Sequence, residues 1–431
     1  MALKDSVKAL GSRFKLDSHH AIERFGVFFG VIVLSSVFIF GAAATSAYSN
    51  SQTALSSTSL YTPTFLTSKT NISGSVPGIF VSGDRTRAMV LMQFKDPNQV
   101  SVNAQDYQAF LTGSTMDLNR EGLKTKVEGS VYVFGSTGYM GVMLDSDQPF
   151  TPQVMNLTMR SNSELVYKKD GTTTSRDDEG ATDASFRKYD QWRVFFNPGG
   201  SEATVSPALD GDKVDVGAIF NDVVISAEEQ KIRDSLDTQL ALMQTDLNRI
   251  KDATAEMERT TADSGTLRLV PPAVPKQIAG DEVTGKAEVG QTPSTLDLKT
   301  DYVMPLGYDF DWRSGNVKAG YLKDLIPQGS NYVSYLAGRA KETPAEFRVN
   351  ELTWMLNDGT NLKRDYQSSN VTVKPLFDIV NRLSQAYQDY YNDKKAYQVD
   401  LHTKLLDLEV SLRNVESNFT VNQGKDVVRS Y

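Results

Sequence analysis

The spacing of hydrophobic and polar positions changes several times along the chain. Between residues 76 and 225, short apolar runs alternate with clusters of Gly, Asp and Asn. The runs that begin at Gly78 and Gly129 each contain a turn signal between two apolar stretches, which is typical of a β-hairpin. No helical period interrupts this region. We therefore predict an antiparallel β domain over residues 76–225, built as a sandwich or a barrel.

The spacing becomes helical at Ser226. Glu229 follows Ser226 by three residues, which is the pairing of a capping box. Apolar residues then recur at intervals of three, four and seven, which predicts an amphipathic helix over residues 226–260. This apolar face consists of Leu236, Leu240, Met243, Leu247, Ile250 and Met257.

A second helical pattern opens at Pro375 and covers residues 375–420. It contains a four-residue step, a stutter, which unwinds a coiled coil locally without ending it. Long apolar stripes are not stable in water, so we expect the two helices to pack together as a coiled-coil-type pair. The second face consists of Leu376, Val380, Leu383, Tyr387, Tyr390, Tyr397, Leu401, Leu405, Leu408, Leu412, Val415 and Phe419.

Two segments connect the predicted helices. Residues 261–300 contain four prolines, which predicts a linker or an extended strap. Residues 301–374 predict a small second β region. Within it, Tyr308, Phe310 and Trp312 alternate with charged residues, so a strand would place the three rings on one face.

An uncharged run of 20 residues occupies positions 25–44. Its length matches the roughly 20 residues that a helix needs to cross a bilayer. The flank over residues 1–24 carries five basic and three acidic residues, which favours a cytoplasmic N-terminus. We predict a transmembrane signal-anchor helix over residues 25–47 and a Ser/Thr-rich stalk over residues 48–75, with the rest of the chain extracytoplasmic.

Two other interpretations of the uncharged run remain. Ala42, Ala43, Ala44 and Ala47 supply the small residues that a signal peptidase needs, although the run exceeds the roughly 7 to 15 apolar residues of a signal peptide. The run also has the length of a buried helix of a soluble protein. Such helices rarely run this long without a polar stripe.

The composition excludes several classes of site and partner. The chain has no cysteine, which excludes disulfides, thiolate catalysis and cysteine-ligated metals. It has 45 Lys and Arg against 53 Asp and Glu, and an acidic excess is a poor fit for nucleic acid. A large exported chain without disulfides is typical of a bacterial cell envelope, and 40% apolar residues suffice for a core.

Histidine offers few catalytic candidates. His19 and His20 precede the uncharged run, and His402 lies in the second predicted helix. A triad or a histidine-ligated metal would therefore depend on His402 alone, so a histidine on the helix surface is the simpler interpretation.

Carboxylates offer two further candidates. Asp210, Asp212 and Asp215 have the spacing of a calcium loop, but the later Gly and Glu of an EF-hand are missing and Asp commonly caps turns. Asp309 and Asp311 share a predicted strand face, as glycosidase carboxylates would, yet alternating acids beside an arginine are common on solvated faces. We predict no enzymatic activity, no cofactor and no metal.

The predicted partner surface lies on the second helix. A dimeric coiled coil would prefer Leu or Ile where this helix has tyrosines. Broad amphipathic rings suit contact with another protein or with the β domain, and internal packing is the alternative. The candidate partner interface consists of Tyr387, Tyr390, Tyr397, Leu401, Leu405, Leu408 and Leu412, and the candidate ligand face consists of Tyr308, Phe310 and Trp312.

These patterns predict an α+β protein with a membrane-anchored β-sandwich-like domain, long coiled-coil-type helices, a small second β region and a polar tail over residues 421–431. We expect a scaffold, for instance a subunit of a secretion, conjugation or surface-appendage complex. Its partners would be the membrane and envelope proteins or other copies of itself.

The alternative is a surface binding module, an adhesin or receptor, that holds a glycan or protein with the β domain. A cell-wall enzyme that uses Asp309, Asp311 or the Asp210 group is a third hypothesis.

Overall fold

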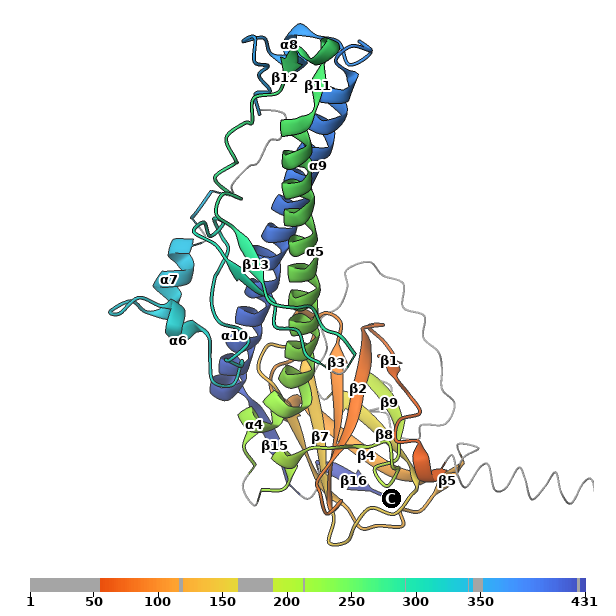
Figure 1. Cartoon of the computed structure of the whole chain (residues 1–431). Coiled ribbons are helices and arrows are strands. Elements are labelled where there is room, and N and C mark those ends of the chain that lie inside the picture. Colours follow the sequence, from red (N-terminus) through yellow and green to blue (C-terminus); the bar gives the residue numbers. More distant parts are fainter. Residues whose placement is uncertain are drawn as a thin grey trace, which may run out of the picture.

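The chain folds into a β-sheet head and an arm of two long helices (Figure 1). This computed structural model describes residues 55–115, 119–161, 189–211, 214–290, 292–339, 341–343, 352–424 and 427–431. The fold is mixed α+β with antiparallel sheets and two long helices, as predicted. Residues 162–188, within the predicted β domain, lie outside the described residues.

The larger sheet of the head has seven described strands in the order β1-β2-β3-β7-β6-β15, with β10 beside β2. Only the β10 pairing is parallel among them. Residues Ala88 to Met92 of β3 are fully buried because both faces of this sheet are covered. The strands are β1 (Thr64–Leu66), β2 (Ser73–Val81), β3 (Arg87–Phe94), β6 (Glu128–Val133), β7 (Tyr139–Asp145), β10 (Thr204–Val205) and β15 (Thr420–Gln423).

The smaller sheet has five described strands in the order β16-β4-β8-β9, with β5 beside β4. The inner faces of the two sheets enclose one apolar core, to which Val90 and Val142 contribute from the larger sheet and Leu111 and Leu157 from the smaller one. The strands are β4 (Tyr107–Ser114), β5 (Arg120–Glu121), β8 (Val154–Ser161), β9 (Gln191–Phe196) and β16 (Val428–Ser430). Short 3-10 helices are η1 (Pro97–Gln99), η2 (Ala104–Asp106), η3 (Pro207–Leu209) and η5 (Asp263–Gly265).

The last residues of the chain return to the head. The sequence predicted a polar tail over residues 421–431, but β15 pairs antiparallel with β6, and β16 pairs parallel with β4. Val428 is buried in the core between the sheets. Each sheet therefore receives a strand from the opposite end of the chain, and the arm is the long connection that makes this possible.

The predicted stalk over residues 48–75 is folded where the structure describes it. Strand β1 pairs with β2, and Leu60 forms a bridge with Phe196 of β9. Phe65 and Ile72 are buried in the head. The stalk prediction is wrong for the described part of this segment. Its Ser and Thr residues form backbone hydrogen bonds with neighbouring strands, and apolar residues between them are buried in the core of the head.

The predicted membrane location needs correction. In the parts of the chain that the structure covers, no helix combines the length and the apolar character needed to cross a bilayer. On this finding we withdraw the single-pass membrane location. The predicted span over residues 25–47 and its flank over residues 1–24 lie outside the described residues.

Two helical segments that run side by side form the arm (Figure 1). Each contains a π-helical turn, η4 in the first segment and η7 in the second. The predicted packing of the two helices is confirmed, and Leu236, Leu240 and Leu383 are fully buried. The first segment comprises α4 (Val216–Phe220), η4 (Asn221–Ile225) and α5 (Ser226–Arg259), and the second comprises α9 (Lys374–Lys395), η7 (Ala396–Leu401) and α10 (His402–Asn418).

The coiled-coil pattern is not confirmed. The buried side of the second segment also includes Lys394, His402 and Glu409, whose polar atoms meet a connecting segment. We call this segment, residues 277–322, the strap. A simple coiled-coil seam would not bury such groups without partners.

The connection between the helices differs from the predicted small β region. Its described strands are β11 (Thr261–Ala262), β12 (Leu267–Arg268), β13 (Glu282–Thr284) and β14 (Asp297–Lys299), followed by helices α6 (Leu322–Leu325), α7 (Tyr332–Arg339) and α8 (Leu362–Asp365). The residues from Tyr308 to Trp312 lie outside any described strand. Their predicted alternation is present, because Tyr308 and Trp312 are buried while Asp309 and Asp311 are exposed. The rings pack on the helices instead of on a sheet.

Candidate functional site

The two groups of residues that the sequence singled out meet each other in the structure. Trp312 Nε1 donates a hydrogen bond to the Tyr397 hydroxyl at 2.9 Å. The rings of Phe310 and His402 lie 4.6 Å apart between centroids. Tyr308 lies beside them, and its carbonyl is 2.7 Å from His402 Nδ1. The candidate ligand face thus covers part of the candidate partner interface from within the same chain.

The π-helical turn η7 shapes this contact. A π-helical turn is wider than an α-helical turn, so a backbone carbonyl within it can be left free to accept a hydrogen bond from another segment. The Gln398 carbonyl accepts a hydrogen bond from Tyr308 N at 2.9 Å. Its side-chain Oε1 accepts another from Met304 N at 3.0 Å. The strap is therefore bonded to the backbone and to the side chain of the same residue.

Lys394 fixes the strap to α9 through buried contacts. The side chains of Lys394 and Asp281 have no exposed surface. The ammonium donates to Asp281 Oδ2 at 2.7 Å, to Thr300 Oγ1 at 2.8 Å and to the Gln277 carbonyl at 2.9 Å, which uses all three of its protons. The Tyr390 hydroxyl also donates to Asp281 Oδ2, at 2.7 Å. Burial lowers the pKa of Lys394, and the Asp281 carboxylate opposes that shift.

Two buried glutamates hold one turn of the strap. Glu229 on α5 accepts hydrogen bonds from Val317 N at 3.2 Å and from the Tyr321 hydroxyl at 2.9 Å. Glu409 on α10 accepts from Tyr321 N at 2.7 Å and from Leu322 N at 2.9 Å. Because both side chains reach the same turn, Glu229 and Glu409 lie at the same level of the arm.

A neighbouring side of these helices carries an open groove of about 460 Å³ between α5 and the η7–α10 part of the second segment. Its apolar lining residues are Ile232, Leu401 and Leu408, each half-buried. At about 100° per residue, the residues of α5 that line the groove centre about 110° around the helix from Glu229, and Ile232 is the one nearest the side that meets the strap. The groove is therefore a second, separate surface of the arm.

The rim of the groove carries charges in a defined order. Along α5, Glu228 lies about one turn nearer the head than Lys231, and along α10, Asp407 lies about one turn nearer the head than Lys404. This order follows because α5 leaves the head and α10 returns to it. Lys231 Nζ and Glu228 Oε1 are 2.6 Å apart, and partial burial raises the pKa of Asp407. Ser235 completes the rim.

The structure places the seven residues of the candidate partner interface in two environments. Leu401 and Leu408 line the groove. The others are at most 3% exposed and pack inside the chain; they are Tyr387, Tyr390, Tyr397, Leu405 and Leu412. Sequence reasoning missed Ile232, Lys404 and Asp407. Ile232 stands four residues before Leu236 and extends the apolar face of α5 by one turn, so the same periodicity contained its signal.

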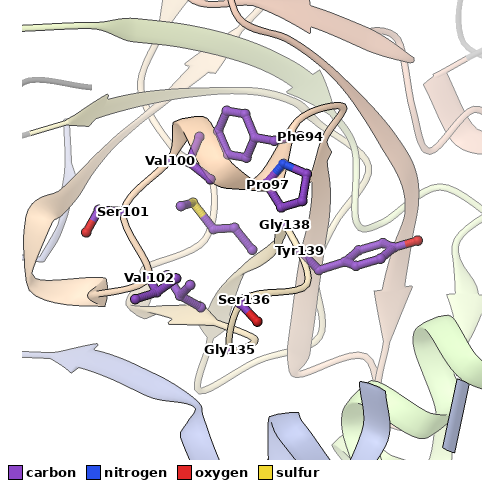
Figure 2. A pocket seen from close by; sticks show the side chains of 11 residues that line it. Phe94, Pro97, Val100, Ser101, Val102, Gly135, Ser136, Gly138 and Tyr139 are labelled. Atoms are coloured by element: carbon purple, nitrogen blue, oxygen red, sulfur yellow. The ribbon is translucent and has the colours of Figure 1, made fainter. Parts of the chain in front are cut away.

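Two hollows in the head provide other candidate sites. One is lined by Phe94, Pro97 and Tyr139 among others and holds about 10 Å³, which is about the space of one water (Figure 2). The other is an open groove of about 760 Å³ beside the C-terminal residues, with Tyr132 and Tyr431 in its lining. Only the second is large enough for a ligand.

The candidate carboxylates bind neighbouring parts of the chain. Asp210 Oδ1 accepts a hydrogen bond from Gly83 N at 2.6 Å, and Asp215 Oδ1 caps α4 by accepting from Ala218 N at 2.9 Å. Asp212 lies outside the described residues. A hydrogen bond from Ser314 lowers the pKa of Asp311. Within the described ranges, no group of three or more His, Cys, Asp or Glu is placed to hold a metal ion.

Comparisons with protein-family models, with curated proteins and with solved structures found no match. The groove between α5 and α10 combines an apolar lining, a charged rim and a position to one side of the strap. These properties suit protein contact more than small-molecule binding, which favours enclosed cavities.

Proposed function

We propose that this chain is a scaffold or assembly subunit that holds a helical protein segment in the groove between α5 and α10. The observation that carries the proposal is the apolar lining of Ile232, Leu401 and Leu408 within a charged rim. An amphipathic helix that lies in such a groove buries its apolar face and leaves its polar face to the rim.

The strap supports the proposal because it fixes the two helices relative to each other. Glu229 and Glu409 bind the same turn of the strap, and Lys394 binds its other end. A preformed groove requires less ordering on binding than a flexible one, which favours affinity.

The test uses the absence of cysteine from the chain, because one introduced cysteine can then be labelled selectively. Ser235→Cys places the thiol at the rim of the groove, and Glu258→Cys places it on an exposed position near the far end of α5 as the control. In intact source cells we expect a maleimide to label the Ser235→Cys variant about tenfold more slowly than the control, because a bound partner covers it. In dilute purified protein the two rates should be similar. Equal rates in cells would contradict the proposal.

The larger groove on the head favours a second candidate function, a binding module for a glycan or a protein. Its lining includes the exposed Tyr431 and Arg429, while Tyr132 of the same lining is buried. Aromatic rings beside a charged group are common in such recognition sites. The expected result is binding to a glycan or peptide array that Tyr431→Ala removes at an unchanged melting temperature. No binding on either array would contradict this candidate.

A further inference from the structure

We propose that Lys394 and Asp281 are joined by an amide bond between Lys394 Nζ and Asp281 Cγ, which fastens the strap to α9 covalently. The two side chains have no exposed surface, and Nζ lies 2.7 Å from Asp281 Oδ2. The chain has no cysteine, so a disulfide cannot fix the strap. This bond would be a modification site of the chain itself, independent of the groove and its partner.

Two local features of the fold bring the reacting groups together. Tyr390 and Lys394 stand four residues apart on α9, so their side chains lie on the same face of the helix. Strands β13 and β14 are antiparallel. Asp281 comes just before β13 and Thr300 just after β14, so the two lie opposite each other at the end of the pair. The amine, the carboxyl and two hydroxyls therefore meet where this pair of strands packs on α9.

The buried site favours the uncharged form of both reacting groups. Burial of an ion pair is costly because both charges lose their hydration. Transfer of one proton from Lys394 to Asp281 gives an amine and a carboxylic acid, and the uncharged amine is a nucleophile. Burial lowers the pKa of Lys394 in the same direction.

The surroundings of Nζ direct this amine at the carboxyl. Nζ lies 2.9 Å from the Gln277 carbonyl and 2.8 Å from Thr300 Oγ1. An amine that donates its two protons to these acceptors turns its lone pair toward its third neighbour, Asp281. The same Thr300 hydroxyl lies 2.5 Å from Asp281 Oδ1, so it connects Nζ to that oxygen and can carry a proton between them.

The condensation needs only these groups. The Nζ lone pair forms a bond to Asp281 Cγ, and an electron pair of the Cγ–Oδ2 double bond moves onto Oδ2, to which the Tyr390 hydroxyl donates at 2.7 Å. One proton passes from Nζ through Thr300 Oγ1 to the protonated Oδ1. The Cγ–Oδ1 bond then breaks, Oδ1 leaves as water and the Cγ–Oδ2 double bond forms again. The products are one amide and one water.

Contact and dryness favour the amide over the separate groups. Reacting groups held in position behave as if their concentration were about 10⁵–10⁸ M. The amide also removes two buried charges, whose burial is costly. The reverse reaction requires water at Cγ, and the side chains of both residues are closed to solvent. Once formed, the bond should therefore persist.

Peptide mapping of the purified full chain tests the bond. Trypsin cuts after Lys and Arg, and an amide on Lys394 blocks cleavage at that position. We expect a branched peptide in which residues 277–286 and 383–395 are joined, with the summed mass of the two peptides minus one water. Asp281→Ala should remove the branched peptide. If the unmodified chain yields only separate peptides, with cleavage after Lys394, the proposal is overturned.

Two further variants test the roles of the hydroxyls. In cell-free synthesis, Tyr390→Phe and Thr300→Val should each form the branched peptide about a hundredfold more slowly, because each removes a group that donates or carries a proton. Tyr387→Phe is the matched control, a buried tyrosine on the same helix, and it should react at the unmodified rate. Unchanged rates in both test variants would overturn the assigned mechanism. The unmodified chain decides by itself whether the bond exists, even if a variant does not fold.

Discussion

Asp246 and His402 are buried titratable residues of the arm, and they respond to pH in opposite directions. Asp246 Oδ1 lies 2.9 Å from Arg249, which also binds Asp389 at 2.9 Å. Burial and the carboxyl of Asp393 raise the pKa of Asp246 to about 6. Burial lowers the pKa of His402 to about 4. The fold is therefore stabilised by the protonated, uncharged form of Asp246 and by the deprotonated, uncharged form of His402.

Asp246→Asn should remove a loss of stability that occurs as the pH rises. A carboxyl whose pKa is raised in the folded state contributes stability that is fully present below its unfolded pKa and is lost as the pH rises through about 6. Asparagine keeps a donor for Asp393 without titrating. At pH 8 we expect the variant to be more stable than the unmodified chain by on the order of 1–2 kcal/mol, with Arg249 screening part of the effect. Thermal unfolding at pH 4 and pH 8 measures the difference, which should shrink at pH 4.

His402→Asn should show the opposite trend. The lowered pKa means that stability present above about pH 6.5 is lost as the pH falls toward 4. His402 Nε2 is buried without a hydrogen-bond partner among the described residues, which fits a neutral ring. The variant should be less stable at pH 7, because it loses contact with Phe310 and Tyr397. As the pH falls from 6.5 to 4, the free energy of unfolding should drop less for the variant than for the unmodified chain. The two drops should differ by on the order of 2–3 kcal/mol. Parallel curves for the two proteins would refute this assignment.

Among the elements, the π-helical turn η7 decides how the strap attaches. Gln398 within this turn binds both Met304 N and Tyr308 N. A π-helical turn holds one more residue than an α-helical turn. The α-helices before and after it can therefore keep their apolar sides facing the same way. The extra residue is the local feature that lets an extended segment bind along a helix.

Deletion of Val399, a half-buried residue of η7, should convert the π-helical turn to an α-helical one. We expect the Tyr308 amide to lose its acceptor and to exchange its hydrogen about tenfold faster, as one lost hydrogen bond predicts. The amides around Leu405 and Leu412 should stay protected, because their face of α10 is preserved. Hydrogen exchange by mass spectrometry measures both regions, with Val399→Ala as the control. Unchanged exchange at Tyr308 would show that η7 does not hold the strap.

For the whole molecule, the C-terminal strands meet strands from the first half of the described chain in the head. Strands β15 and β16 come from the C-terminus and add to sheets whose other described strands all precede residue 206. The arm and the strap lie between these two parts of the sequence. The head is therefore complete only after the last residues have folded back.

Truncation after Phe419 should destabilise the head more than the arm. It removes the pairing of β15 with β6 and of β16 with β4, and it removes buried Val428. We expect a loss of at least about 2 kcal/mol, the value for burial of one aliphatic side chain. Hydrogen exchange should rise in β4 and β6 while α5 and α9 keep their protection. Removal of Tyr431 alone is the control. Equal loss in head and arm would mean that the two unfold together.

The sequence by itself determined the elements with a strong local period. The first helix was predicted over residues 226–260 and α5 is Ser226–Arg259, because the burial of one helix face imposes a spacing that is visible locally. The hairpins that form β2–β3 and β6–β7 were visible for the same reason. The inward direction of Tyr308 and Trp312 also followed from alternation.

Only the tertiary structure decided which surfaces are covered. Tyr390 and Tyr397 of the second helix are buried beside a strap whose Asp281 lies 113 residues from Lys394, and no local pattern records such a partner. The groove depends on how α5 and α10 align, because that alignment brings Ile232 beside Leu401 and orders the rim charges. The polar residues after Phe419 gave no strand signal, and the free edges of β6 and β4 made them strands. Periodicity reports which face of an element is apolar, whereas the partner of that face is set by packing between residues far apart in the chain.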